Sequence, residues 1–190
     1  MKKKRVVTRD ELINIGKEVF SEKGYFLSKV SDIVKKAGVC QGTYYLHFES
    51  KKDLLSAIID EFHRDIHKIL FEDNYLANGG MSVLISKEKG LFNYFMNNVK
   101  TTLLIFREGY GEVEFVERLT QIHKEMTEAR KLILKEILRN NEEAELYGYL
   151  LGGVLRGLFM YSVEKKLEKD VYEPLLEEML VKFFKSLNLL

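Results

Sequence analysis

The amino-acid sequence predicts an all-α protein. Strand signals are scarce, because runs of alternating β-branched residues and the hairpin dipeptides that join them are missing. Leu, Glu and Lys are abundant and there is a single proline, a composition that favours helices. With 190 residues, of which 46% are apolar, the chain can bury a substantial core. We expect about nine helices, in one large domain or two small ones.

The first helix begins at a capping box. Thr8 can accept a hydrogen bond from the amide of Glu11, whose side chain can reach back to Thr8. Val7 and Leu12 form the hydrophobic staple that accompanies such a box. Apolar residues then repeat at helical spacing up to Gly24, which supplies a C-terminal stop.

The next two helices form a helix-turn-helix pattern. Ser28 can cap a second, short helix that ends at Gly38, and a third helical segment starts three residues later. On a helical wheel that starts at Gln41, Tyr44 and Phe48 point inward. The side chains left to point outward are Gln41, Thr43, Tyr45, Leu46 and His47.

The rest of the chain continues as helices. A fourth, longer helix opens at Ser50 and carries an apolar stripe as far as Leu70. Beyond it, polar or Gly-containing gaps separate roughly four further helices. The gaps are Asn74–Gly80, Arg107–Glu112, Arg139–Glu143 and Glu168–Asp170. The last helix, from about Val171, has Pro174 in its first turn, where a missing N–H matters least.

The formal net charge of +1 hides an asymmetry along the chain. Residues 1–52 carry twelve Lys and Arg against six Asp and Glu, a charge of +6, while the remainder carries −5. The basic segment is therefore the expected contact for a polyanion, and the acidic remainder needs another role.

The single cysteine excludes an intramolecular disulfide framework and a Cys-rich zinc module, which indicates a reducing compartment. No secretory signal is visible, so we expect a cytoplasmic protein. The apolar stretch Leu146–Val163 approaches the length of a membrane span, but Arg156 lies well inside it and no second span follows. A helix buried in the protein is the favoured interpretation.

The outward side chains of the third helix suit duplex DNA. Gln41 can bond adenine bidentately in the major groove, and Thr43 can meet a thymine methyl group or a phosphate. Tyr45 and His47 can donate to phosphate oxygens, and Lys51 lies where a helix begins, so that its ammonium and the first backbone amides could meet one anion. Gly42 leaves room for close approach of the backbone.

These residues resemble the tetracycline-repressor (TetR) family of transcriptional regulators. The match covers about a quarter of the chain and runs through Gly24–Tyr25, Val30–Ile33, Ala37–Val39, Gly42–Tyr45, His47–Phe48, Ser50–Lys51 and Leu54. In such proteins the matching positions that contact operator DNA are Gln41, Gly42, Thr43, Tyr45, His47 and Lys51. The resemblance also implies a homodimer whose C-terminal helices hold an inducer pocket.

The expected organisation follows from the resemblance. Residues 1–52 would form the three-helix DNA-binding domain, and residues 53–190 would form the helical domain for ligand binding and dimerisation. Two positions depart from the family pattern: Leu46 could contact bases only through an apolar surface, and Cys40 replaces the usual Ser cap of the third helix. Cys40 could act as a redox sensor, but a small tolerated residue is the simpler interpretation.

The helix from about Glu142 to Lys166 is apolar nearly all round, so it must be covered on both sides. One subunit alone would struggle to cover it, and together with the last helix it is the candidate for a four-helix dimer interface. The residues expected at this interface are Gly148, Leu151, Gly152, Leu155, Phe159, Leu176, Leu180 and Phe183.

Aromatic and Met residues in the middle helices could line an adaptable apolar pocket, with His and Arg as polar anchors. The candidates are Phe95, Met96, Phe106, Tyr110, His123, Met126, Arg156 and Tyr161. Core packing explains most of the apolar members equally well, and surface ion pairing explains the charged ones.

We therefore expect a ligand-responsive repressor that a small apolar inducer releases from a pseudo-palindromic operator. The alternative is a helical dimeric binding or scaffold protein that does not touch DNA, and a small helical enzyme comes third. His63 and His67 have metal-compatible spacing, but a solvated pair is favoured. We expect no cofactor, no metal and no catalytic residue.

Overall fold

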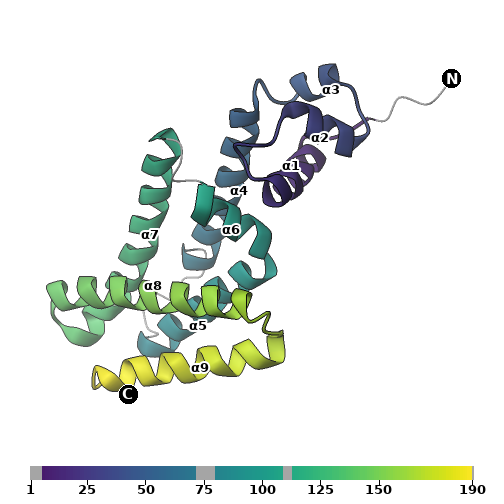
Figure 1. Cartoon of the computed structure of the whole chain (residues 1–190). Helices are drawn as coiled ribbons and strands as arrows, with labels where there is room; N and C mark the ends of the chain where they lie inside the picture. Colours follow the sequence, from purple (N-terminus) through teal and green to yellow (C-terminus); the bar gives the residue numbers. More distant parts are fainter. Residues whose placement is uncertain (1–5, 72–79, 109–112, 190) are drawn as a thin grey trace. The chain divides into compact units, whose positions relative to one another are not determined.

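The computed structural model describes residues 6–71, 80–108 and 113–189, and these residues form nine helices and no strand (Figure 1). The all-α prediction is confirmed. The chain divides into two compact units, Met1–Asp65 with Lys100–Leu119 (unit 1) and Ile66–Val99 with Thr120–Leu190 (unit 2). Two of the boundaries between the units fall inside the long helices α4 (Lys51–Phe71) and α7 (Val113–Leu138), so each of these helices contributes several residues to both units.

Unit 1 begins with three helices in the predicted order. They are α1 (Arg9–Lys23), α2 (Val30–Ala37) and α3 (Gln41–Tyr45). The capping box of α1 is present, because the amide of Glu11 donates to Thr8 Oγ1 at 3.2 Å and the amide of Thr8 donates to Glu11 Oε2 at 2.9 Å. Gly24 and Gly38 end α1 and α2 with φ angles of 82° and 70°, which favour glycine.

The cap of α2 differs from the prediction. Lys29, not Ser28, is the N-cap, and its amide donates to Asp32 Oδ2 at 2.9 Å. The Ser28 side chain is buried instead, and its hydroxyl donates to the Tyr25 carbonyl at 2.8 Å. The serine thus stabilises the turn between α1 and α2 rather than the helix that follows it.

Close packing joins α1 to α4. A Cβ atom at Gly16 would lie 2.7 Å from Leu54 Cδ2, and Leu54 is fully buried. The two helices therefore approach more closely than any residue larger than glycine allows without displacement of Leu54. The core around this contact includes Leu12, Phe20, Ile33, Tyr44, Phe48 and Ile58. Unit 1 also contains most of α6 (Val99–Glu108).

Unit 2 is built from α5 (Gly80–Asn97), the larger part of α7, α8 (Asn141–Glu164) and α9 (Lys169–Ser186). Helix α8 contacts α5 and lies side by side with α9 (Figure 1). Residues that fill the core of this unit include Leu84, Phe92, Leu134, Leu151, Phe159, Leu180 and Phe184.

Two helix boundaries differ from the expected ones, namely the break between α5 and α6 and the start of α9. The segment after Gly80 was expected to form one helix, but it is interrupted at Asn98. The side-chain amide of Asn98 donates to the Tyr94 carbonyl at 2.9 Å, so it competes with backbone amides for that acceptor. Helix α9 starts at Lys169, which moves Pro174 into the second turn, where the ring removes a backbone bond inside the helix.

A buried ion pair lies in the core of unit 2. Arg130 on α7 donates from Nε to Glu88 Oε1 at 2.8 Å and from Nη2 to Glu88 Oε2 at 2.9 Å. Both side chains are almost fully buried, at 3% and 1% exposure. The glycines of α8 accommodate the arginine, because a Cβ at Gly152 would lie 2.9 Å from Arg130 Nη1 and one at Gly148 would lie 3.5 Å from Arg130 Cβ.

Candidate nucleic-acid interface

Aromatic residues of α3 and of the segment that follows it pack into the core of unit 1. Tyr44 is fully buried, and its hydroxyl donates to the Ser50 carbonyl at 2.9 Å, at the residue that precedes α4. Phe48 is 1% exposed and its ring lies 5.8 Å from that of Tyr44. Burial, and then the nearby Asp53 carboxylate, raise the pKa of Tyr44, so its hydroxyl remains protonated and able to donate. The prediction that both rings point inward is confirmed.

The remaining residues of this segment face away from the core. Gln41 and Gly42 are exposed, Tyr45 is 54% exposed and Leu46 is 82% exposed. Thr43 and His47 are partly buried. The segment therefore presents an amide, a phenol and an apolar side chain at the surface while its own rings are packed inside. We call Gln41, Gly42, Thr43, Tyr45, Leu46 and His47 the reading surface.

Cys40 is the N-cap of α3, as the sequence predicts, and its side chain makes no capping bond to the helix. Its Sγ lies 3.4 Å from Thr43 Oγ1, and the residue is exposed. A serine at this position would offer a better acceptor to the amides of the first turn. The short helix thus depends on Tyr44 and Phe48 more than on its cap.

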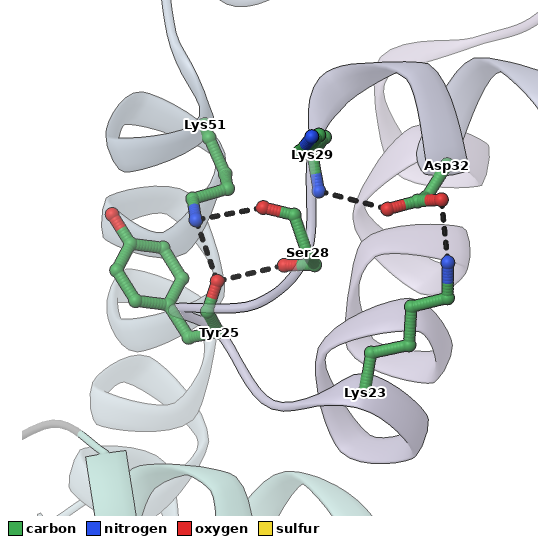
Figure 2. A network of polar contacts seen from close by, with 6 residues as sticks. All are labelled: Lys23, Tyr25, Ser28, Lys29, Asp32 and Lys51. Atoms are coloured by element: carbon green, nitrogen blue, oxygen red, sulfur yellow. Dashed lines mark hydrogen bonds and ion pairs between the residues drawn. The ribbon is translucent and has the colours of Figure 1, made fainter.

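Lys51, the first residue of α4, reaches the turn between α1 and α2 (Figure 2). Its Nζ donates to the carbonyls of Tyr25 at 2.6 Å and Ser28 at 2.9 Å, and lies 3.4 Å from that of Phe26. The ammonium also lies 4.2 Å from the centroid of the Tyr25 ring. Lys51 is partly buried, unlike most of the reading surface.

Ion pairs join the helices of unit 1 to one another. Lys23 on α1 pairs with Asp32 on α2 at 2.5 Å (Figure 2), and the Lys23 ammonium and the Lys29 amide lower the pKa of Asp32. Lys36 on α2 pairs with two carboxylates of α1, and Lys17 on α1 pairs with one of α4. The distances are 2.9 Å for Lys36–Glu18, 2.7 Å for Lys36–Glu22 and 2.6 Å for Lys17–Glu61. Several cations of the basic segment are therefore engaged within the protein.

Known proteins are similar to this chain in sequence and in fold. Residues 12–58 match the family model described as "Bacterial regulatory proteins, tetR family". The HTH-type transcriptional regulator YdgC of Bacillus subtilis is 33% identical over 149 residues, which cover 78% of this chain and 71% of that protein. The chain belongs to the TetR family. It is a DNA-binding transcriptional regulator.

Two further known proteins are similar to this chain. The fatty acid metabolism regulator protein of Bacillus subtilis is 31% identical over 138 residues, 71% of this chain and 70% of that protein. The solved structure of the transcriptional regulator FadR from Bacillus subtilis, in complex with stearoyl-CoA, is 22% identical with a TM-score of 0.75, and the match covers 93% of this chain and 97% of that one. The structural likeness shows that the two chains share a fold.

The residues predicted to line a ligand pocket of this TetR-family protein belong to both units. Phe95 is buried, with its ring 6.1 Å from that of Phe159, and Met96 and Met126 are partly buried in unit 2. Phe106 is partly buried and belongs to unit 1. Tyr110 lies outside the described residues.

The polar candidates lie at the surface of unit 2. His123 is exposed on α7, with its ring 5.8 Å from that of Tyr149. Partial covering by its neighbours, and then the positive Arg130 and Arg156, lower the pKa of His123, which favours the neutral imidazole. Arg156 is exposed and Tyr161 is 49% exposed on α8.

The residues predicted at the dimer interface are largely covered by the chain's own helices. The buried ones are Gly148, Leu151, Leu155, Phe159, Leu176 and Leu180, whereas Gly152 and Phe183 are partly buried. The glycines of this face accommodate Arg130 of the same chain. The fully buried members of this set therefore have little surface to offer a partner, and the dimer interface itself stays a prediction.

The opposite face of α8 is apolar and exposed. Its residues recur at the spacing of one helix face, and they are Leu146, Tyr149, Leu150, Gly153, Gly157, Met160 and Tyr161. The five side chains larger than glycine are 45–55% exposed, and a Cβ at Gly153 or Gly157 would have no atom within 4 Å. We call these residues the open face of α8.

The structure also bears on the apolar stretch of α8 and on the spacing of His63 and His67. Within the described ranges, no helix is both long and apolar enough to cross a membrane, including α8. The described residues also hold no cluster of three or more His, Cys, Asp or Glu side chains with the geometry of a metal site. The ring of His67 lies 4.7 Å from that of Phe71 on the same helix.

Proposed function

We propose that this TetR-family regulator is a cytoplasmic homodimeric repressor that reads a pseudo-palindromic DNA site through the reading surface. The observation that supports this proposal most strongly is the division of α3, where Tyr44 and Phe48 are buried and Gln41, Tyr45 and Leu46 are exposed. Gln41 would bond a base edge, Leu46 would meet an apolar base edge, and Tyr45 and His47 would donate to phosphates. Thr43 could contact either a base edge or a phosphate.

A selection from a pool of random duplexes tests this function. The protein is immobilised, bound duplexes are amplified over several rounds, and the enriched sequence is compared with a shuffled duplex in a salt titration. We expect a two-fold-symmetric enriched site whose affinity falls steeply with salt and remains above that of the shuffled duplex. Failure to enrich any duplex, with equal weak binding to all sequences, would overturn the proposal.

Gly42→Ala should weaken DNA binding while leaving the fold intact. A Cβ at Gly42 would meet only Cys40 Sγ at 3.9 Å, so the protein itself has room for it. Alanine also favours a helix over glycine by about 1 kcal/mol. At a surface pressed against a DNA groove, the extra methyl group should cost about 1–3 kcal/mol of binding free energy by overpacking. Fluorescence anisotropy on the enriched duplex and thermal unfolding of the free protein measure the two effects.

Asn14→Ala, at an exposed uncharged position on α1, is the control for that experiment. It should leave affinity unchanged and raise stability by no more than about 0.7 kcal/mol, through the helix preference of alanine. Unchanged affinity in Gly42→Ala would show that the backbone of α3 does not approach the duplex closely at this position.

The open face of α8 supports the proposed homodimer. Soluble monomers rarely leave a contiguous apolar face of this kind uncovered. Partly exposed Leu175, Met179 and Phe183 on the neighbouring α9 extend the apolar surface. A second copy of the chain could cover both helices with the same surface, which gives a two-fold-symmetric four-helix contact. Such a dimer would present two copies of α3 to successive major grooves.

The small molecule is proposed to carry a long apolar chain, and a long-chain acyl-CoA is the first class to test. The support is the stearoyl-CoA in the similar FadR structure and the name of the fatty acid metabolism regulator relative. Addition of stearoyl-CoA should release the enriched duplex, because a ligand that prefers another arrangement of the protein lowers DNA affinity by its differential binding energy. Coenzyme A alone is the control. Equal anisotropy with and without stearoyl-CoA would exclude this ligand class.

A further inference from the structure

Leu46 projects from the side of the α3 segment that lies opposite the core. Its backbone angles, φ −73° and ψ −19°, are helical, and the amide of Phe48 donates to the Tyr44 carbonyl at 3.0 Å. The helical geometry that begins at Gln41 therefore extends past the end of α3. At about 100° per residue, Leu46 points about 180° away from the mean direction of the buried rings of Tyr44 and Phe48. The 82% exposure of its side chain agrees with this direction.

Gly42 lies one turn before Leu46 on the same outer side of the segment. It has no side chain, and a Cβ there would meet only Cys40 Sγ at 3.9 Å, so an approaching surface can come close to the backbone. The Leu46 side chain is therefore the group that extends furthest from this side. The polar members of the reading surface flank it, with Gln41 and Tyr45 on one side and Thr43 and His47 on the other.

A major groove offers few partners to a hydrocarbon side chain. Leu46 has no donor or acceptor in its side chain, so it cannot bond a phosphate or the polar edge of a base. Contact with those polar groups would exclude water from them without replacing its hydrogen bonds. The apolar group that base edges present in the major groove is the C5-methyl group of thymine.

We propose that Leu46 is a specificity-determining residue that reads the C5-methyl group of a thymine in each half-site. The polar residues on its two flanks would hold the segment in the groove, and Leu46 would pack against the methyl group between them. A cytosine that carries a C5-methyl group would offer the same contact. This inference rests on the proposed function, because it names the base feature that one residue of the reading surface selects.

Replacement of thymine by deoxyuridine tests this contact directly, because it removes the methyl group and keeps the hydrogen-bonding edge of the base. Each thymine of the enriched duplex is replaced in turn, in both half-sites at once, and affinity is measured by anisotropy for the wild-type and Leu46→Ala proteins. Burial of one methyl group corresponds to about fourfold in affinity, so we expect a loss of about tenfold or more over two half-sites at one thymine position. In Leu46→Ala the same replacement should change affinity by about twofold or less.

The reverse comparison places cytosine or 5-methylcytosine at the same position, each paired with guanine. The wild-type protein should bind the methylated duplex about tenfold more tightly than the unmethylated one, whereas Leu46→Ala should bind both equally. Since Leu46 is exposed, the Leu46→Ala protein should fold with a Tm no lower than that of the wild type, which thermal unfolding checks.

Two further variants make the assignment to Leu46 specific. Leu132→Ala removes the same apolar group from α7, where the leucine is 50% exposed, and it should keep the wild-type ratio of thymine to uracil affinity. Thr43→Ser removes the other methyl group of the reading surface and keeps the hydroxyl. It should also keep that ratio at the thymine that Leu46 contacts.

An enriched half-site without thymine would overturn the inference, as would uracil losses that are the same in the wild-type and Leu46→Ala proteins. Loss of the uracil effect in Thr43→Ser, with the effect retained in Leu46→Ala, would assign the methyl group to Thr43 and overturn it too. Each of these results requires an enriched duplex. They therefore differ from a failure of the proposed function, in which the wild-type protein enriches no duplex and the role of Leu46 falls with it.

Discussion

Glu88→Ala is expected to lower the free energy of unfolding by about 3–5 kcal/mol. The substitution leaves the guanidinium of Arg130 buried at 3% exposure without the carboxylate that accepts its two hydrogen bonds at 2.8 Å and 2.9 Å. An uncompensated charge in a core costs much more than the intact pair contributes. Thermal unfolding followed by circular dichroism should show a Tm lower by about 6–20 °C at fixed protein concentration.

The double variant Glu88→Leu with Arg130→Met is the matched control. It removes both charges and fills a similar volume, so it should recover most of the lost stability. Gly152→Ala probes the same site from α8, because its Cβ would lie 2.9 Å from Arg130 Nη1. A Glu88→Ala protein with wild-type Tm would show that water or another group readily replaces the carboxylate, contrary to the buried geometry.

Gly153→Arg is expected to convert the proposed dimer into a monomer and to lower operator affinity about 10²- to 10⁴-fold. The position has no atom within 4 Å of a Cβ, so the single chain can accommodate the arginine. A partner copy seated on the open face of α8 could not do so without burying an unpaired charge. Affinity falls because the second half-site contact then becomes a separate bimolecular event.

Analytical ultracentrifugation of the wild-type and variant proteins measures the mass, and anisotropy on the enriched duplex measures the affinity. Thr120→Arg adds the same charge at an exposed position on α7 and should leave both quantities at wild-type values. If Gly153→Arg sediments as a dimer at the same concentration, the open face of α8 is not the subunit contact.

The structural predictions that depend only on neighbouring residues in the sequence are confirmed. The capping box of Thr8 and Glu11 and the stops at Gly24 and Gly38 are each encoded within a few residues, and all three are present. The inward direction of Tyr44 and Phe48 follows from helical spacing alone. These features are enough to place the helix-turn-helix and the reading surface.

Features that depend on contacts between residues far apart in the chain could not be predicted from local sequence patterns. Both faces of α8 are apolar, so periodicity did not show which one the chain itself covers. The pair of Glu88 and Arg130 joins residues 42 positions apart, and neither charge stands out in its own helix. The carbonyls that Lys51 contacts belong to a turn more than twenty residues earlier, so no local pattern indicates these hydrogen bonds.

The ion pairs between the helices of unit 1 have a consequence for how the regulator searches a genome. Lys17, Lys23 and Lys36 are each held by carboxylates of the same unit, so they contribute little attraction toward an arbitrary stretch of duplex. Residence on unrelated sequence should therefore be brief, and few molecules should be sequestered there. Discrimination would then come from the base edges that the exposed residues of α3 meet, and a small number of dimers could occupy a rare site.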